Sequence, residues 1–291
     1  MMSEFACTVG VVDLLPSQTA LTAAAARAAH PIVDQAPFIF VDPLAGTLLG
    51  TRADELLDYH RRHGGHPVLS GARTQVTCRS RYTEDRLAAT RPPQYVILGA
   101  GLDSFGYRSP LAGTVRTFEV DHPATQEWKR ARLSEARIPV PEHVTYVPFD
   151  FETGTLAQAM RRNGFDPTRP ALVSWLGVTM YLTRPAIAQT LATIGDLAPG
   201  TEVVLDYMLP EPLRDEPGQL YADSVAPVAA ERGEPWLSFF APDELDALLE
   251  DAKLQRVEHV RQHDLRAPAW PDRTDALHPA DLSVLALARV A

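Results

Sequence analysis

Three strand-like runs in the middle of the chain end in residues that could contact a small ligand. The run YVILGAGLD passes from apolar residues into Gly99 and Gly101 and ends at Asp103. Two glycines after a strand let the backbone turn tightly and approach a ligand closely, because neither carries a Cβ. The runs TVRTFEVD and HVTYVPFD end at Asp121 and Asp150. If the strands are parallel, their carboxyl ends meet at one sheet edge, where open α/β folds bind ligands.

These acidic strand ends favour a cationic ligand over a phosphorylated one. A dinucleotide needs a glycine-rich helix N-terminus for its pyrophosphate and one acid about 20 residues further on for the ribose. Here the third glycine position holds Ser104, and Asp103 lies inside the turn that a phosphate would have to approach. S-adenosylmethionine carries no phosphate, and its sulfonium and ammonium suit acidic walls. Glu119, which precedes Asp121 by two residues, would face the same crevice but is expected to be structural.

Composition and charge narrow the class of protein. The chain has 291 residues, of which 45% are hydrophobic and 22% charged, as in an ordinary globular protein of one large domain or one domain with an added cap. Its net charge of −10 opposes nucleic acid and anionic lipid, so neither is expected as a partner. Cys7 and Cys78 lack metal-ligand spacing, so no disulfide framework and no metal site is predicted. Without a signal-like N-terminus or a long apolar run, the protein is expected to be soluble and cytoplasmic.

Helical segments precede an alternation of strands and helices. The composition predicts N-terminal helices at 17–30, where Pro31 follows, at 53–63 and at 70–91. Strands are predicted at 94–98, 115–120, 143–148, 171–176 and 201–207, with helices between them at 123–137, 153–163 and 184–197. This alternation indicates a parallel sheet with helices on both faces. The remainder should comprise a proline-rich segment with one or two helices (208–240), a helix (241–252) and two closing strands (253–260 and 281–290).

Four ordered motifs resemble those of one protein family. They are VILGAGLDSFGYR, FEVDHP, VPFDFE and WLGVTMYL, and the stretches RSRYTEDRL and GEPWLSFFAPDEL add to the likeness. Together they resemble the leucine carboxyl methyltransferase family, most closely its bacterial branch of S-adenosylmethionine-dependent O-methyltransferases, which includes polyketide methyltransferases. The resemblance implies a seven-stranded, Rossmann-like class I methyltransferase fold with one antiparallel strand near an edge.

The resemblance also implies how one methyltransferase domain divides over residues 1–291. An N-terminal helical cap takes residues 1–92, and the cofactor-binding α/β core takes 93–207. A lid-like insertion at 208–240 and a closing helix and strands at 241–291 complete it. The cap and the insertion are expected to cover the cofactor and to set the choice of methyl acceptor.

The resemblance assigns the methionine end of S-adenosylmethionine to residues before and after the first strand. Arg79 is expected to bind its carboxylate, because a planar guanidinium can do so with two hydrogen bonds. Arg73 and Arg81 are the neighbouring alternatives. Gly99 and Gly101 should pass close to the methionine part. Asp103 should either hold the loop or meet the ammonium through water.

The same resemblance assigns the nucleoside end to the next two strand ends. Asp121 is expected to accept hydrogen bonds from the ribose hydroxyls. Asp150 should accept from the adenine amino group, with the backbone of Phe151 reading the ring edge. Where many relatives carry a glutamate near the cofactor ammonium, this chain has Leu176. Either a backbone carbonyl near Leu176 and Gly177 replaces that acid, or Asp103 and water hold the ammonium.

The acceptor side of the site is less defined by the sequence. Trp175 and Tyr181 flank the fourth motif and are predicted to line the acceptor pocket, although both could pack in the core. A carboxylate acceptor is already ionised at neutral pH, whereas a phenol of pKa about 10 needs help to lose its proton. His122, His143 and Tyr181 have suitable chemistry for a base, but no spacing singles one out, so the catalytic residue stays unassigned.

The predicted activity is S-adenosylmethionine-dependent O-methylation, by direct in-line transfer, of a carboxylate or phenol on a small molecule such as a polyketide-type metabolite. Two other classes stay open. A nicotinamide-dependent oxidoreductase would share the glycine turn and the acid after the second strand, but would leave Asp150 and the incomplete glycine set unexplained. A non-catalytic binding protein on the same fold is compatible with Leu176. The oligomeric state is not predicted.

Overall fold

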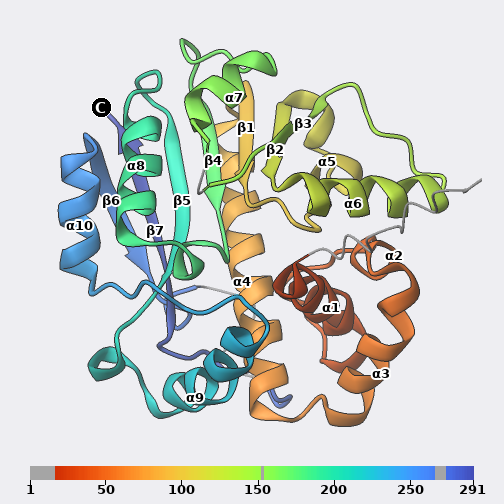
Figure 1. Cartoon of the computed structure of the whole chain (residues 1–291). Coiled ribbons are helices and arrows are strands. Elements are labelled where there is room, and N and C mark those ends of the chain that lie inside the picture. Colours follow the sequence, from red (N-terminus) through yellow and green to blue (C-terminus); the bar gives the residue numbers. More distant parts are fainter. Residues whose placement is uncertain (1–16, 152–153, 266–272) are drawn as a thin grey trace, which may run out of the picture.

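The computed structural model describes residues 17–151, 154–265 and 273–291 and shows a central sheet with helices on both faces and a helical cap at one end (Figure 1). The strands are β1 (Gln94–Leu98), β2 (Arg116–Asp121), β3 (Val144–Pro148), β4 (Ala171–Trp175), β5 (Glu202–Met208), β6 (Leu254–Val260) and β7 (Ser283–Val290). The longer helices are α1 (Gln18–Val33), α3 (Ala53–His63), α4 (Pro67–Thr90), α6 (Pro123–Glu135), α7 (Leu156–Arg162), α8 (Arg184–Gly195), α9 (Glu216–Glu231) and α10 (Pro242–Asp251). Short helical turns are α2 (Ala45–Leu48), α5 (Phe105–Arg108), η1 (Gly50–Arg52), η2 (Ala112–Thr114), η3 (Thr179–Tyr181) and η4 (Glu211–Leu213).

The seven strands lie in the order β3-β2-β1-β4-β5-β7-β6. Strands β1 to β5 run parallel, and β7 is antiparallel to both β5 and β6. The chain order reverses beside β1, because β2 and β4 pair with its two sides. Ligands bind at such a switch point in open α/β sheets. The predicted fold class, a seven-stranded Rossmann-like sheet with one antiparallel strand near an edge, is confirmed.

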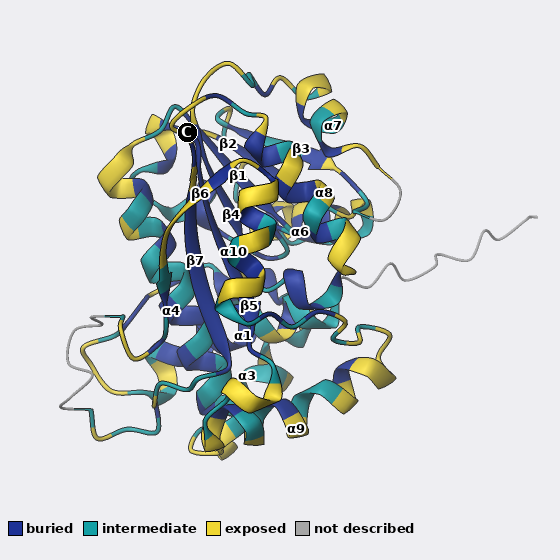
Figure 2. Cartoon of the chain, turned by 90° about the vertical axis from the view of Figure 1, so that its left-hand side faces the viewer, coloured by how far each residue is buried: buried dark blue, intermediate teal, exposed yellow. Residues whose placement is uncertain are grey.

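The apolar strand sequences fit burial on both faces of the sheet. Strands β1, β4 and β5 are buried along their whole length, whereas the edge strand β6 is exposed in its middle, a contrast visible in Figure 2. Apolar side chains of α7, α8 and α10 pack on one face of the sheet. Helix α4 and the short α5 pack on the other face.

The N-terminal helices differ slightly from their predicted bounds. Helix α1 continues through Pro31 to Val33, although Pro31 has no N–H to donate within the helix. The backbone N–H of Asp34 then closes the helix on the carbonyl of His30 at 3.1 Å. Helix α4 begins at Pro67, three residues before its predicted start. The ring of His66 accepts from the N–H of Val68 at 3.3 Å and so caps that helix.

The segment between β5 and α10 contains one long helix, α9, which packs against α4. Gly71 in α4 makes this contact possible, since a Cβ there would meet the ring of Tyr221 in α9 at 3.0 Å. The predicted boundaries of the cap and the lid-like insertion remain a proposal, and residues 1–16 of that cap lie outside the described residues. The predicted helix 153–163 also starts outside them, and α7 is described from Leu156. Within the described residues, no helix is long and apolar enough to cross a membrane.

Candidate active site

A cavity of about 1380 Å³ lies at the carboxyl ends of the parallel strands, between the cap, helix α4 and the segment around α9. Eight of the nine residues assigned to the cofactor or the acceptor line it: Arg79, Gly99, Gly101, Asp103, Asp121, Asp150, Phe151 and Tyr181. These residues come from α4, from the end of β2, from the loops after β1 and β3, and from η3 after β4. The structure therefore brings together residues that lie up to about a hundred positions apart in the chain.

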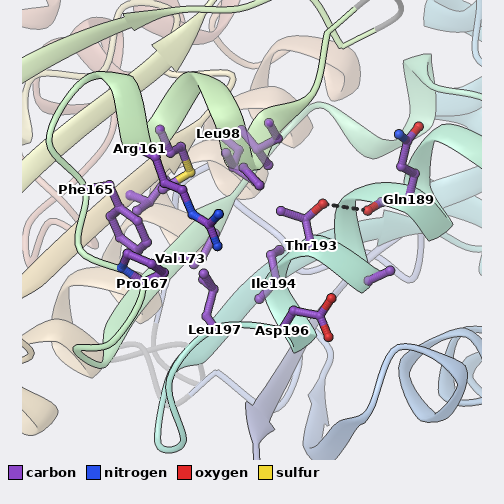
Figure 3. Close-up of a pocket in the computed structure, with 15 residues that line it drawn as sticks. Leu98, Arg161, Phe165, Pro167, Val173, Gln189, Thr193, Ile194, Asp196 and Leu197 are labelled. Carbon is purple, nitrogen blue, oxygen red and sulfur yellow. Dashed lines mark hydrogen bonds between the residues drawn. The ribbon is translucent and has the colours of Figure 1, made fainter.

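A smaller cavity of about 270 Å³ lies between α7, α8 and the sheet, and Figure 3 shows its lining. Leu98, Val173 and Ile194 give it an apolar wall, and Arg161 extends toward it from α7. None of the residues assigned to the cofactor or the acceptor lines this cavity. We therefore place the candidate site in the larger cavity.

The glycine loop after β1 is shaped for close approach. Gly99 and Gly101 have φ values of 66° and 50°, in the left-handed region that disfavours side chains. A Cβ at Gly99 would overlap Val178 after β4, and one at Gly101 would lie 3.3 Å from Ala20 of α1. The loop therefore has no room for a side chain at Gly99 and little room for one at Gly101.

Asp121 ends β2 directly against this loop. Its Oδ2 accepts from the N–H of Gly101, and its Oδ1 accepts from the N–H of His122 at 2.6 Å. Burial raises the pKa of Asp121 above its usual value, while the two backbone N–H groups act in the opposite direction. Each carboxylate oxygen retains acceptor capacity beyond its one backbone partner. Asp121 is placed to bind hydroxyl groups beside the glycine loop.

The other two acids of the first strand ends have different positions. Asp103 is half-buried, and its Oδ1 accepts from the N–H of Phe105 at 2.7 Å. This contact holds the loop, which is one of the two roles expected for Asp103. Glu119 is fully buried and binds Lys129 at 2.6 Å, and it is not among the residues lining the cavity. Burial raises the pKa of Glu119 to about 6, although Lys129 opposes the shift. The idea that Glu119 also faces the crevice is wrong, whereas its expected structural role fits this contact.

The loop after β3 brings Asp150 and Phe151 to the cavity wall. The ring of Phe151 stacks on Trp175, with ring centres 6.4 Å apart and planes 14° from parallel. Trp175 itself is fully buried in the core and is absent from the described lining of the cavity. Its predicted place in the acceptor pocket is therefore wrong, because its side chain packs in the core on the face of the sheet that α7, α8 and α10 cover. Tyr181 lies on the cavity wall beside Trp236 and Tyr221.

Of the three candidate arginines, Arg79 alone lines the cavity among the described residues. Arg73 is buried and forms two hydrogen bonds with Asp34, at 2.7 and 2.8 Å. Arg81 is half-exposed and pairs with Asp85 on the helix surface. The Nη1 of Arg79 donates to Asp206 at 3.0 Å, and its side chain is 13% exposed.

Asp206 is the residue at this site that sequence reasoning missed. It lies on β5 with no exposed surface, and its Oδ1 accepts from the N–H of Gly177 at 2.6 Å. One feature of the sequence could have indicated Asp206: it is the single acid inside the apolar run VVLDYM. Register places it one position beyond the Trp175–Leu205 pair, so Asp206 stands on the strand beside Leu176. The side chain of Leu176 packs against the apolar cluster under α4.

The candidate bases have structural contacts or unfavourable pKa values. His122 lines the cavity and caps α6, accepting from the N–H of Ala124 at 3.3 Å. His143 contacts the carbonyl of Gly106 at 3.0 Å and is not among the residues that line the large cavity. Burial raises the pKa of Tyr181. His60, which the sequence did not single out, also lines the cavity, but burial and then Arg73 lower its pKa to about 4.

One group of side chains within the described residues has the spacing of metal ligands. Asp215, His263 and Asp281 offer atoms that lie within 4.8 Å of one another. Asp215 caps α9 at the N–H of Gly218 (2.8 Å), and the Oδ2 of Asp281 pairs with Arg261 (2.7 Å). The buried Oδ1 of Asp281 has no hydrogen-bond partner among the described residues. This group lies apart from the glycine loop and carries no assignment.

Comparison with known proteins identifies the family. The family model described as leucine carboxyl methyltransferase matches residues 20–195, which is more than half of the chain, and the chain belongs to this family. A Bacillus subtilis protein named "Putative S-adenosyl-L-methionine-dependent methyltransferase" is 36% identical over 63% of this chain and 61% of its own length. A Mycobacterium tuberculosis protein with the same description is 33% identical over 66% of this chain and 65% of its own length.

The chain thus spans between about half and two thirds of the length of the curated relatives that it matches. Solved structures agree on the fold. A "putative methyltransferase" from Thermobifida fusca superposes with a TM-score of 0.62 at 19% identity, over 99% of both chains. A Streptomyces avermitilis protein gives 0.60 at 17% identity, over 92% of this chain and 97% of its own. S-adenosyl-L-methionine is the cofactor that the descriptions of these relatives name.

Proposed function

We propose that this protein transfers the methyl group of S-adenosylmethionine to an oxygen atom, on a carboxylate or phenol, of a bulky small molecule such as a polyketide-type metabolite. The observation that carries the proposal is the continuous cavity of about 1380 Å³, which joins the glycine loop to an apolar wall. Small-molecule pockets usually measure roughly 300–1,000 Å³, so this cavity has room for a cofactor and a second ligand.

The residues at one end of the cavity fit the proposed cofactor. The open donors of Arg79 suit the methionine carboxylate, and Asp121 suits the ribose hydroxyls. Asp150 is assigned to the adenine amino group, with the backbone of Phe151 at the ring edge. The bend at Gly99 and Gly101 leaves the backbone bare where the methionine part would lie.

The residues at the other end suit an apolar acceptor. Tyr181, Tyr221 and Trp236 belong to one cluster on the cavity wall. Tyr59 of α3 and Leu237 after α9 line the same cavity and are 55% and 51% exposed, which places large apolar side chains where the cavity meets solvent. Such an exposed apolar rim is a mark of ligand-binding grooves.

Two hydrogen bonds link the cap to the segment after α9 at the wall of the cavity. Glu234, which follows α9, accepts from the hydroxyl of Ser17 at 2.5 Å and from the N–H of Thr19 at 3.2 Å. The start of α1 is thereby tied to the segment after α9. We propose that the cap and the insertion exclude water from the methyl group, as their assigned boundaries imply.

The donor supplies a methyl group already activated by a positively charged sulfur. The protein then has to orient the acceptor oxygen, and orientation contributes several kcal/mol to the lowered barrier. We favour a carboxylate acceptor over a phenol, because a carboxylate needs no base to remove a proton. Burial raises the pKa of Tyr181 and that of Tyr221, the latter to about 12, so neither tyrosine is a ready proton acceptor at neutral pH.

The test is an acceptor screen with S-adenosylmethionine and detection of the methylated product by mass spectrometry. Bulky carboxylic acids and phenols are compared with small ones and with amines. We expect methyl esters of bulky carboxylic acids, and Asp121→Ala should suppress the product. Methylation confined to nitrogen would contradict the proposal. Cofactor binding with no turnover would favour the non-catalytic alternative, and binding of a nicotinamide dinucleotide would favour the oxidoreductase.

A further inference from the structure

A buried acid on β5 is placed in a way that its strand alone does not explain. Asp206 has no exposed surface and lies between Leu205 and Tyr207, which are also fully buried. Removing a carboxylate from water costs several kcal/mol unless hydrogen bonds and an opposite charge compensate it. Asp206 has a hydrogen-bond donor in Gly177 and an opposite charge in Arg79, and both residues line the large cavity.

The contacts of Asp206 join three elements at that wall. Its Oδ2 accepts from Arg79 of α4 at 3.0 Å, and its Oδ1 accepts from Gly177 after β4 at 2.6 Å. Its backbone carbonyl accepts from the hydroxyl of Thr179 at 2.6 Å. One residue of β5 therefore fixes both the arginine and the loop over which the arginine lies.

The guanidinium of Arg79 lies directly over Gly177. A Cβ at position 177 would be 2.5 and 2.7 Å from the two terminal nitrogens of Arg79, and the φ of Gly177 is +71°. Among the described residues, Asp206 is the one acceptor bonded to this guanidinium. Because the side chain of Arg79 lines the cavity, its remaining N–H groups are available to an anion there.

We propose that Asp206 is a positioning residue, which holds the fork of Arg79 so that its second edge meets the carboxylate of the bound cofactor. This inference rests on the proposed function, since it needs a cofactor with a carboxylate at Arg79. Asp206 does not touch the cofactor. It acts through the orientation of a guanidinium that would otherwise rotate about a flexible side chain.

The test compares two ligands, of which only one carries the amino-acid part with its carboxylate. S-adenosylhomocysteine carries the amino-acid part, and 5′-methylthioadenosine carries the same nucleoside without it. By calorimetry, Asp206→Asn should weaken the first ligand by about tenfold or more, the loss expected when a charge-assisted hydrogen bond is misplaced. The affinity for the second should change less than about twofold, because its contacts do not pass through Arg79.

Glu202→Gln is the matched control, because Glu202 lies on the same strand and pairs with Arg86 of the same helix, outside the cavity lining. It should leave both affinities unchanged. If Asp206→Asn does not fold, Arg79→Lys is the second variant, since it keeps a charge for Asp206 but loses the second edge of the fork. The same ligand-selective loss is expected in it.

Equal losses for the two ligands in the folded variant, or no loss for either, would overturn the positioning role. In that case wild-type protein still binds S-adenosylhomocysteine, and the proposed function stands. Wild-type protein that binds neither ligand would instead refute the proposed cofactor site, and the positioning role with it.

Discussion

Helix α4 and strand β5 form the same kind of ion pair twice, once at each end of the strand. Arg86 binds Glu202 at the amino end with two hydrogen bonds of 2.6 and 2.5 Å. Arg79 binds Asp206 at the carboxyl end with one hydrogen bond of 3.0 Å. Similar residues on the same two elements are thus used in two different ways.

The two ion pairs differ in whether their charged groups have hydrogen-bonding capacity left for a ligand. Glu202 also receives two hydrogen bonds from Arg289, at 3.0 and 2.6 Å, so its carboxylate is held by two arginines. At the other end, one edge of Arg79 holds Asp206, and the rest of its guanidinium faces a large cavity. A pair whose groups are satisfied within the protein stabilises the fold, whereas a pair with open donors beside a cavity is equipped to bind a ligand.

The largest expected effect separates the two arginines. Arg79→Ala should weaken S-adenosylhomocysteine binding by about 2–3 kcal/mol, because it removes a charged hydrogen-bond donor and leaves Asp206 buried without its cation. Arg86→Ala should leave affinity unchanged and lower the free energy of unfolding by up to about 1 kcal/mol, since that pair is partly exposed. Calorimetry and chemical denaturation measure the two quantities.

Arg81→Ala serves as the surface control for both variants and should affect neither quantity. If Arg86→Ala weakened the ligand as much as Arg79→Ala, the distinction between the two ends of β5 would fail.

A pair of glycines provides the second comparison. Gly177 and Gly200 both have positive φ, 71° and 83°, but a Cβ at Gly177 would meet Arg79, whereas a Cβ at Gly200 would have nothing within 4 Å. Each change to Ala should cost about 1–2 kcal/mol of stability through the backbone alone. Only Gly177→Ala should also weaken cofactor binding, by roughly tenfold, because it displaces the guanidinium.

Unaltered affinity in Gly177→Ala, measured on folded protein, would show that the position of the guanidinium is not critical. A loss in Gly200→Ala would show that affinity follows general stability instead of the site.

The smallest effects concern pH. Burial raises the pKa of Asp121 at the carboxyl end, so its protonation on acidification begins at a higher pH than for an ordinary aspartate. Protonation removes the charge that ribose hydroxyls would meet, so cofactor affinity should fall by a few-fold as pH is lowered. A pKa that is higher in the folded state means that protonation of Asp121 stabilises the folded protein. The loss of cofactor affinity at acid pH should therefore not be caused by unfolding that protonation of Asp121 brings about. Calorimetry of wild type and Asp121→Asn across acid pH should show the dependence in wild type alone.

Glu202 should respond in the opposite sense. Burial works against it, but hydrogen bonds from Arg86 and Arg289 lower the pKa of Glu202 below its usual value. Its ionised form therefore contributes stability above the unfolded pKa, and this is lost as pH falls through the folded pKa. Glu202→Gln should remove that part of the acid sensitivity of unfolding. An equal acid dependence of unfolding in the variant would contradict the assignment.

The sequence predicted the parts of this arrangement that depend on local pattern. Apolar runs and breakers gave the strands, and Gly99 and Asp121 mark the ends of two of them. Resemblance gave the antiparallel strand near the edge of the sheet and Arg79. Contacts between distant segments were not predictable. Asp206 is a lone acid in an apolar strand, and only the pairing of β4 with β5 reveals that it stands beside Leu176 and beneath Arg79. The prediction that Trp175 lines the acceptor pocket was wrong, because the sequence does not determine whether the last side chain of a strand points into the core or into the cavity.

The most direct test of the account is a crystal structure of the protein with S-adenosylhomocysteine. We expect its carboxylate on the open edge of Arg79, with Asp206 still bonded to the other edge, and its ribose hydroxyls on Asp121. An amino-acid part bound away from Arg79, or a nucleoside bound away from Asp121, would contradict the assignment of the carboxyl end of the sheet as the cofactor site.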